Sequence, residues 1–237
     1  MFGRVVYKEQ IVDLQDKGFI SKLKITLLDV FDKTVNADRN LLFHCDPLRK
    51  YKPDENGISD VQFNEAYNAE LEYFNKWYAD LYKPVLEYAK KLDDNTLVLF
   101  DRIETGTSTY ELAKKMFDNK KVFYVDGSTP IEEREKIRAQ LETSGDNILF
   151  ASTAVFSTGI NIKRLTHIMF LFNTKSYSRV LQSIGRTLRL HASKQFAHLI
   201  DCCFNTKYSQ KHLAERLKIY KQSYGKKYDE KINLQVS

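Results

Sequence analysis

The sequence contains few of the residues that interrupt regular structure, with 9 glycines and 4 prolines among 237 residues. Their scarcity predicts long helices and strands with few loops. Long apolar runs are also missing. The longest runs, such as residues 168–172, are far too short to cross a bilayer, which argues against a membrane-spanning helix. The first residues, MFGR, lack the apolar core and cleavage site of a secretory signal. We therefore expect a cytoplasmic protein with no membrane partner.

Cysteine is scarce as well, with Cys45, Cys202 and Cys203 in the chain. Their number is odd and two of them are adjacent, which favours reduced thiols over a disulfide. His198 together with Cys202 and Cys203 suggests a zinc site, but no second ligand pair follows at the spacing that zinc requires. We therefore expect no metal site in this chain.

Apolar and basic residues, in contrast, are plentiful. Hydrophobic residues make up 43% and aromatic residues 13% of the chain, enough for a large buried core. The formal net charge is +6, and residues 205–231 hold eight Lys or Arg against three Asp or Glu. This basic excess suits a polyanionic partner such as a nucleic acid.

Short apolar runs alternate with helical patterns, most regularly from residue 95 onward. The runs predict strands at residues 22–30, 96–100, 121–125, 147–151, 167–172 and 195–201. The patterns predict helices at residues 107–117, from 129, at 176–188 and at 207–224. Strands that are apolar throughout and alternate with helices are typical of a parallel sheet covered on both faces. We therefore predict an α/β fold of this kind.

The first third of the chain is organised differently. Residues 32–60 are polar and contain two prolines and a glycine, which predicts a loop-rich insertion. Residues 61–92 have helical periodicity, and Pro84 should kink or split this region. The predicted divisions are a connector strand with the variable insertion (1–60), the main α/β domain (61–205) and a basic C-terminal helix (206–237).

The most specific segment for function, residues 182–189, reads QSIGRTLR. Arg186 and Arg189 are three residues apart, so they share one helical face and can reach one anion together. Guanidinium groups suit a phosphoryl group because they offer forked donors and keep their charge. An arginine finger neutralises a transferring phosphoryl group in this way. The alternative is a surface helix with two solvated arginines, which is the commoner origin of such a pair.

Two further segments follow predicted strands, where ligands of parallel sheets bind. Residues 148–162 form a strand and then a turn with Ser152 and Thr153, whose hydroxyl and backbone N–H groups can hold a phosphate. An ordinary capped turn is the alternative. Residues 97–102 form a strand that ends at Arg102, a cation placed for a nucleic-acid backbone, although many parallel strands end this way.

In this order, the three segments resemble motifs IV, V and VI of superfamily 2 helicases, over about residues 96–205. Motif VI of that family has the core Gln-x-x-Gly-Arg-x-x-Arg, and its motif V ends as residues 159–161 do, in Gly-Ile-Asn. Residues 155–160 and 180–186 look like the phage recombination and repair helicases of the UvsW kind. The resemblance implies a RecA-like C-terminal lobe of a bacteriophage DNA helicase, in the cytoplasm of the host.

The roles of these motifs in the family imply a site for ATP and a track for DNA. The residues implied to act on the γ-phosphate are Arg186 and Arg189. Those implied to face the nucleotide are Gln182, Gly159 and Asn161. Those implied to contact the nucleic-acid backbone are Arg102, Ser152 and Thr153. The implied partners are single-stranded or branched DNA, ATP with Mg²⁺, and an N-terminal RecA-like lobe with which this lobe would enclose the nucleotide.

Two elements that such a motor needs are missing from this sequence. It has no Gly-x-x-x-x-Gly-Lys phosphate loop, and no Asp-Glu pair ends an apolar strand. The pair Asp54-Glu55 lies in the polar stretch with the prolines, so it does not fit. We therefore expect that this chain does not hydrolyse ATP alone and that it is a fragment, a split-gene product or a stand-alone remnant, with the N-terminal lobe as its missing partner.

A second hypothesis is a stand-alone nucleic-acid-binding or regulatory module without ATPase activity. Tyr220, Tyr224 and Tyr228 recur every four residues among lysines, and aromatic rings beside lysines can stack on bases. The simpler interpretation is an amphipathic helix that packs its tyrosines on the sheet. A Rossmann-type transferase has little support, because no glycine-rich turn follows a first strand.

Overall fold

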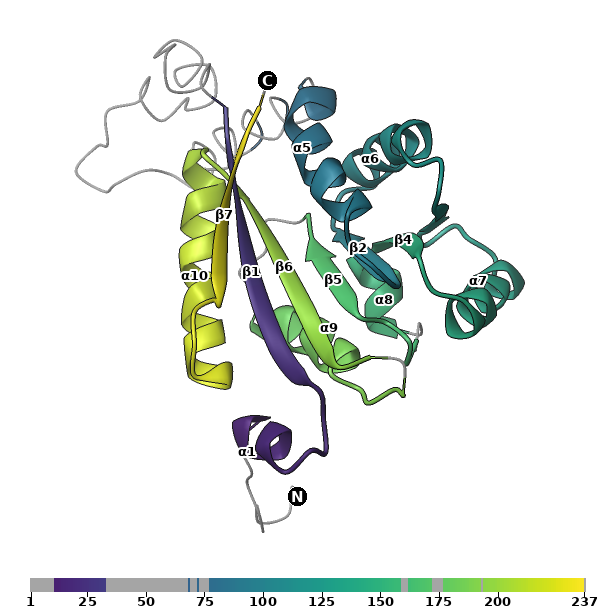
Figure 1. The fold of residues 1–237 in the computed structure, drawn as a ribbon. Coiled ribbons are helices and arrows are strands. Elements are labelled where there is room, and N and C mark those ends of the chain that lie inside the picture. Colours follow the sequence, from purple (N-terminus) through teal and green to yellow (C-terminus); the bar gives the residue numbers. More distant parts are fainter. Residues whose placement is uncertain are drawn as a thin grey trace, which may run out of the picture.

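A computed structural model of the chain describes residues 11–32, 68, 72, 77–158, 162–171, 177–192 and 194–236. The strands are β1 (Lys22–Phe31), β2 (Thr96–Phe100), β3 (Lys121–Val125), β4 (Asn147–Ser152), β5 (His167–Phe170), β6 (Phe196–Phe204) and β7 (Glu230–Gln235). Over the described residues they form one seven-stranded sheet in the order β3-β4-β2-β5-β6-β1-β7, and every neighbouring pair is parallel (Figure 1). The predicted parallel α/β class is confirmed.

Central strands such as β2 are apolar along their whole length because helices cover both faces of the sheet. Leu97 and Leu99 of β2 belong to one hydrophobic cluster, whereas Val98 and Phe100 belong to another. All four side chains are fully buried. Since successive side chains of a strand alternate between its faces, a strand between two helical layers must be hydrophobic at every position.

Two layers of helices make these clusters. On one face lie α5 (Tyr78–Lys90) and α6 (Ile103–Met116). The other face carries α7 (Ile131–Thr143), α8 (Thr153–Thr158), α9 (Tyr177–Thr187) and α10 (Lys207–Tyr224). The short α1 (Ile11–Asp16) precedes β1 and contacts α10. The prediction that helices cover both faces of the sheet is therefore confirmed.

Helix α6 begins earlier than predicted. A start at residue 107 is wrong, because the helix begins at Ile103, directly after Arg102 in extended conformation. Gly106 therefore lies inside the helix, and a Cβ added there would be 2.4 Å from the ring of Phe100. This glycine allows α6 to pack closely on β2.

The end of the chain contains a strand that the sequence did not predict. After α10 the chain turns at Gly225, whose φ of +73° suits glycine. β7 then pairs with β1, so β1 lies inside the sheet, between β6 and β7. The final residues are thus a helix followed by an edge strand. The predicted domain boundaries at residues 60 and 205 stay predictions.

The polar insertion and the helical region that follows it are only partly described. Cys45 and the pair Asp54-Glu55 lie outside the described residues. Asn68 and Glu72 are helical, and α5 continues through Pro84, so this proline does not split the helix. No helix in the described part of the chain is long and apolar enough to cross a membrane.

A buried ion pair holds α10 to the sheet. Arg216 donates through Nε and Nη2 to the two carboxylate oxygens of Asp201 in β6, at 2.9 and 2.8 Å. Tyr220 donates its hydroxyl to the same carboxylate at 2.6 Å. Burial opposes the charge of Arg216, but Asp201 outweighs this effect and raises the pKa of Arg216 above its ordinary value. Arg216 therefore keeps its positive charge inside the fold.

Candidate nucleotide and nucleic-acid interface

Helix α9 turns its predicted site residues away from the core. Ile184 and Leu188 are buried in the cluster on this face of the sheet. Gln182 and Gly185 are exposed on the other side of the helix, and Arg186 is half-buried. A Cβ added at Gly185 would meet no atom of the described residues within 4 Å. This side of α9 is therefore open to a neighbouring surface.

Arg186 lies in the last turn of α9, whereas Arg189 lies two residues beyond the helix end and is exposed, so the expectation that both share one helical face is wrong. The Arg186 guanidinium donates a hydrogen bond to the carbonyl of Phe156 in α8, and its Cζ lies 5.3 Å from the centre of the Phe156 ring. Burial lowers the pKa of Arg186, and the positive charge of Arg189 lowers it further. The second effect means that the two charges repel each other. An anion bound by both would relieve this repulsion.

Ser152 and Thr153 mark the passage from β4 to α8. Ser152 is 4% exposed and Thr153 is 8% exposed, so both are buried. The Ser152 hydroxyl accepts the backbone N–H of Val155 at 3.4 Å and so caps the first turn of α8. The capped turn that was the alternative interpretation is thus present at Ser152. Gly159 and Asn161 lie outside the described residues.

Arg102 lies at the same edge of the sheet as these hydroxyl residues. Phe100 at the end of β2 pairs with Ser152 at the end of β4, so Arg102 and Thr153 follow neighbouring strand ends. Arg102 is half-buried and connects β2 with α6 in extended conformation. The three residues predicted for nucleic acid therefore meet at the carboxyl edge of the sheet, where ligands of such sheets bind.

The arginine pair lies apart from that edge. Helix α9 follows β5 and ends beside the start of β1, where the backbone N–H of Ser21 donates to the carbonyl of Leu188 at 2.8 Å. Helix α8 connects the two groups, because it begins at Thr153 and its residue Phe156 accepts a hydrogen bond from Arg186. The predicted nucleotide residues and the predicted nucleic-acid residues are thus separate groups that share α8.

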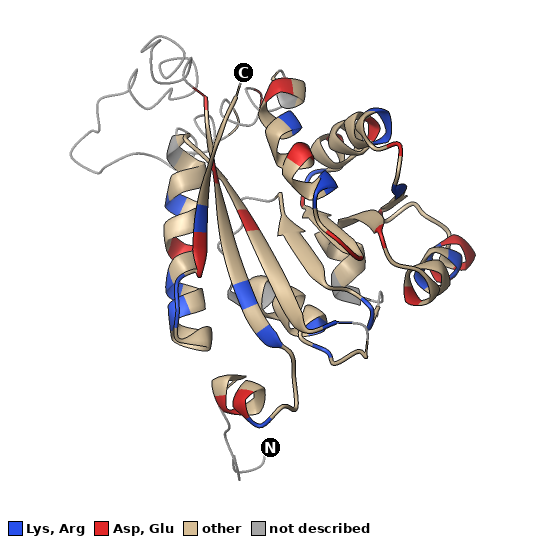
Figure 2. Cartoon of the chain, in the orientation of Figure 1, with Lys and Arg blue, Asp and Glu red and all other residues tan. Residues whose placement is uncertain are grey.

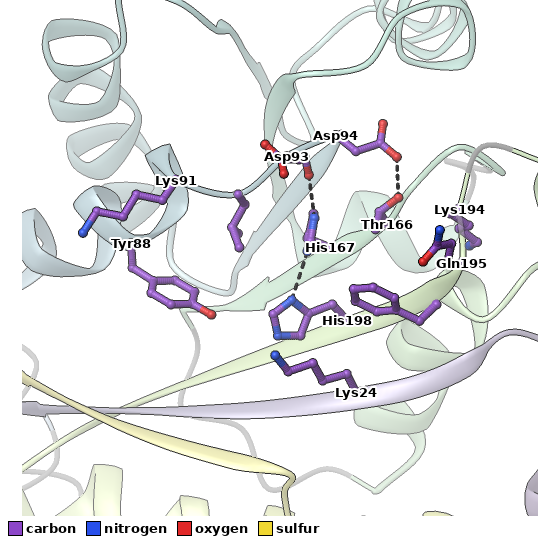
Figure 3. A pocket seen from close by; sticks show the side chains of 12 residues that line it. Lys24, Tyr88, Lys91, Asp93, Asp94, Thr166, His167, Lys194, Gln195 and His198 are labelled. Carbon is purple, nitrogen blue, oxygen red and sulfur yellow. Dashed lines mark hydrogen bonds between the residues drawn. The ribbon is translucent and has the colours of Figure 1, made fainter.

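The amino edge of the sheet holds a cavity that the sequence did not indicate (Figure 3). It measures about 520 Å³ and lies between the starts of β2, β5 and β6. His167 and His198 are paired across β5 and β6, and their Nδ1 atoms are 3.0 Å apart. Burial lowers the pKa of both rings, that of His198 to about 3. Both rings are therefore neutral at physiological pH.

The neighbours of the two rings fix where their protons lie. His167 Nε2 is 2.6 Å from the carbonyl of Asp93, which only accepts, so this nitrogen carries the hydrogen. His198 must then donate from Nδ1 to His167, and its Nε2 accepts the hydroxyl of Thr26 at 2.8 Å. Every ring nitrogen is satisfied within the protein, so the pair serves the fold and does not offer itself to a ligand.

Cys202 and Cys203 do not form a shared ligand set. Cys202 packs in the cluster beneath α5, whereas Cys203 packs with Leu213 of α10, on the opposite face of the sheet. Burial raises the pKa of Cys203 to about 12, so its thiol stays protonated. Among the described residues, no group of His, Cys, Asp and Glu has the composition of a metal site.

The exposure of Tyr220, Tyr224 and Tyr228 shows which of these rings could stack on a base. Tyr220 and Tyr224 are 1% and 5% exposed, so both pack on the sheet, whereas Tyr228 is 41% exposed. The packing interpretation is therefore confirmed for the first two, and base stacking by them is wrong. Lys and Arg residues lie along α10 and in the first half of β1 (Figure 2), although Arg216 of α10 is buried.

Comparison with known proteins gives the class of this chain. Residues 79–191 match the model of the helicase conserved C-terminal domain. Over 248 aligned residues, the chain is 38% identical to the ATP-dependent DNA helicase uvsW of Enterobacteria phage T4, covering 98% of this chain and 44% of the T4 protein. The chain therefore belongs to the helicase C-terminal domain family and is related to UvsW.

Solved structures agree on the fold. The crystal structure of T4 UvsW superposes with a TM-score of 0.62 and 26% identity, over 92% of this chain and 42% of that one. The ATP-dependent Type ISP restriction-modification enzyme LlaBIII, solved bound to DNA, has a TM-score of 0.62 over 98% of this chain and 17% of its own. Its identity of 13% shows a shared fold alone. This chain thus spans less than half the length of these relatives.

Proposed function

We propose that this chain is the C-terminal motor lobe of an ATP-dependent DNA helicase or translocase. The observation that carries the proposal is the side of α9 that faces away from the core, where Gln182 and Gly185 are exposed and Arg186 is half-buried, with the exposed Arg189 just beyond the helix end. The hydrogen bond from Arg186 to Phe156 also orients one guanidinium before any ligand binds.

In this proposal the arginine side of α9 closes on a nucleotide that an N-terminal RecA-like lobe holds. ATP supplies the phosphoanhydride bond whose hydrolysis drives movement along DNA. Arg186 and Arg189 bind oxygens of the γ-phosphate and stabilise the charge that develops there, with Arg189 as the finger. Gln182, Gly159 and Asn161 orient the same nucleotide from this lobe.

The residues of this lobe suit the phosphate but not the Mg²⁺ ion. Arg186 and Arg189 carry guanidinium groups that suit a phosphate, whereas the described residues contain no cluster of carboxylates that could hold a cation. Mg²⁺ would therefore be held by the N-terminal lobe, which would also supply the phosphate loop.

DNA binds, in this proposal, at the carboxyl edge of the sheet. Arg102 and Thr153 follow neighbouring strand ends and contact the backbone of one strand. Ser152 shapes the turn between them, since its hydroxyl already caps α8. DNA is proposed over RNA because the T4 relative is a DNA helicase by name.

The test joins this chain to the N-terminal lobe of T4 UvsW in one polypeptide and measures ATP hydrolysis with and without single-stranded DNA. The chain alone should be inactive, and the joined protein should show DNA-stimulated hydrolysis. Arg189→Ala should lower kcat by roughly 10³-fold, the scale of an arginine finger. Arg138→Ala is the matched control, because Arg138 is a half-buried arginine of α7, outside both predicted sites, that pairs with Glu135 at 2.8 Å.

Two results would count against the proposal. Hydrolysis by the joined protein that Arg189→Ala leaves unchanged would remove the finger role. DNA binding that Arg102→Ala leaves unchanged in strength and in salt dependence would remove the proposed track, because one lost phosphate contact should reduce the salt slope by about one.

A further inference from the structure

The turn that carries Arg189 is held by hydrogen bonds from two distant segments of the chain. The last carbonyls of a helix have no partner within the helix. Here three consecutive carbonyls find partners elsewhere. Lys194 Nζ donates to Thr187 at 2.6 Å, the Ser21 backbone N–H to Leu188 at 2.8 Å, and the Ser21 hydroxyl to Arg189 at 3.4 Å. The backbone of this turn is therefore fixed on both sides of Leu188.

Lys194 also binds a third segment. Its ammonium group donates to the carbonyl of Leu165 at 3.1 Å, just before β5. Lys194 is half-buried and lies at the border of the cavity beside Thr166 (Figure 3). A positive charge at the carboxyl end of α9 is also favourable for the helix dipole. The side chain of Lys194 thus connects the end of α9 to the residue just before β5.

Ser21 provides the other attachment. It is 5% exposed and directly precedes β1, and its own carbonyl accepts a hydrogen bond from Gln15 of α1 at 3.1 Å. Ser21 therefore connects the Arg189 turn with the segment that leads into the sheet. Three parts of the chain that are far apart in sequence, residues 11–21, 165–166 and 187–194, meet at this turn.

We propose that Ser21 and Lys194 are positioning residues that hold the Arg189 turn in place for the reaction of the joined lobes. This inference rests on the proposed function, since it assigns Arg189 to the γ-phosphate. Neither residue is placed to contact the nucleotide, because Ser21 is buried and the Lys194 ammonium group donates hydrogen bonds to two backbone carbonyls. They act through Arg189. Loss of either attachment lets the turn move, and a misplacement of about 1 Å at a catalytic group can reduce a rate about 10²-fold.

The first experiment needs no nucleotide and uses this chain as it is. Hydrogen exchange is measured at the amide of Leu188, which donates to Ile184 at 3.1 Å within the last turn of α9. Lys194→Met should raise this exchange rate at least about 10-fold, because the turn opens locally when its attachment is lost. Lys91→Met is the matched control, since Lys91 is an exposed lysine that lines the same cavity. It should leave the rate unchanged.

The second experiment uses the polypeptide that joins the two lobes. Lys194→Met should lower kcat about 10-fold or more, while the KM for ATP and the affinity for DNA stay within about twofold, as expected for an effect on the transition state. Lys194→Arg should restore most of the rate, because a guanidinium keeps the charge and can donate to both carbonyls. In an Arg189→Ala background, Lys194→Met should have no further effect.

The outcomes separate this inference from the proposed function. Unchanged exchange at Leu188 in Lys194→Met overturns the inference, whatever the activity. If exchange rises and Arg189→Ala lowers kcat, but Lys194→Met leaves kcat unchanged, the turn is held for folding alone and the positioning role is wrong. If Lys194→Met lowers kcat equally with and without Arg189, it does not act through that arginine. If Arg189→Ala itself has no effect, both the proposed function and the inference fail.

Discussion

Replacing Arg216 by methionine should destabilise this fold far more than a surface substitution in α10. The side chains of Arg216 and Asp201 are 0% and 1% exposed, and two hydrogen bonds of 2.9 and 2.8 Å join them. Methionine has a similar length but leaves the Asp201 carboxylate buried without its counter-charge. Removing one partner of a buried ion pair costs about 3–5 kcal/mol.

Urea unfolding followed by circular dichroism measures this loss. The free energy of unfolding should fall by about 3–5 kcal/mol at an unchanged m value, and the Tm by roughly 10 °C. Adding Asp201→Asn to Arg216→Met removes the uncompensated charge and should recover part of the loss.

The control for this prediction is Lys218→Met in the same helix. Lys218 pairs with Glu215 at 2.7 Å, but the two side chains are 71% and 43% exposed, so this change should cost less than about 1 kcal/mol. If Arg216→Met lowers the free energy of unfolding by no more than Lys218→Met does, the buried pair does not anchor α10.

Two further predictions concern the packing of the sheet. The folded pKa of His198, about 3, lies below its ordinary value of 6.5, so as the pH falls from 6.5 the unfolded chain takes up a proton that the folded chain does not. The contribution of this group to the free energy of unfolding should be constant above pH 6.5 and should fall by about 1.4 kcal/mol per pH unit below it. In urea unfolding, His198→Gln should therefore lose stability less steeply than the parent protein between pH 6.5 and 5. Equal losses per pH unit in the two proteins would contradict the assignment. Gly106→Ala would bring a Cβ within 2.4 Å of the Phe100 ring, so it should lower the free energy of unfolding by about 1–3 kcal/mol, and a more stable variant would show that α6 does not pack there.

The strands were predictable because each one is an apolar run. β2 and β3 have the predicted bounds, and the ends of the other predicted strands shift by one to three residues. β7 was missed because it is a short edge strand in a basic region, with partly buried residues alternating with exposed ones. The start of α6 was misplaced because the hydroxyls at residues 107–108 resemble a helix cap, whereas Gly106 belongs to a contact with Phe100 that exists only in three dimensions.

The candidate site was predictable only where a motif marks it. The string at residues 182–189 indicated both arginines, but no sequence pattern indicates Ser21 or Lys194, whose roles lie in hydrogen bonds to backbone carbonyls. The pairing of His167 with His198 likewise depends on the register of β5 and β6. Residues that act through the backbone or through strand register leave no local signature in a single sequence.

Single-turnover hydrolysis of ATP by the joined lobes tests the central claim most directly, because it isolates the chemical step from product release. With saturating DNA, Arg189→Ala should slow this step by roughly 10³-fold while Arg138→Ala reacts at the parent rate. If both variants hydrolyse ATP at the same rate, the open side of α9 does not face the γ-phosphate, and the assignment of this chain as a motor lobe with its finger at Arg189 is contradicted.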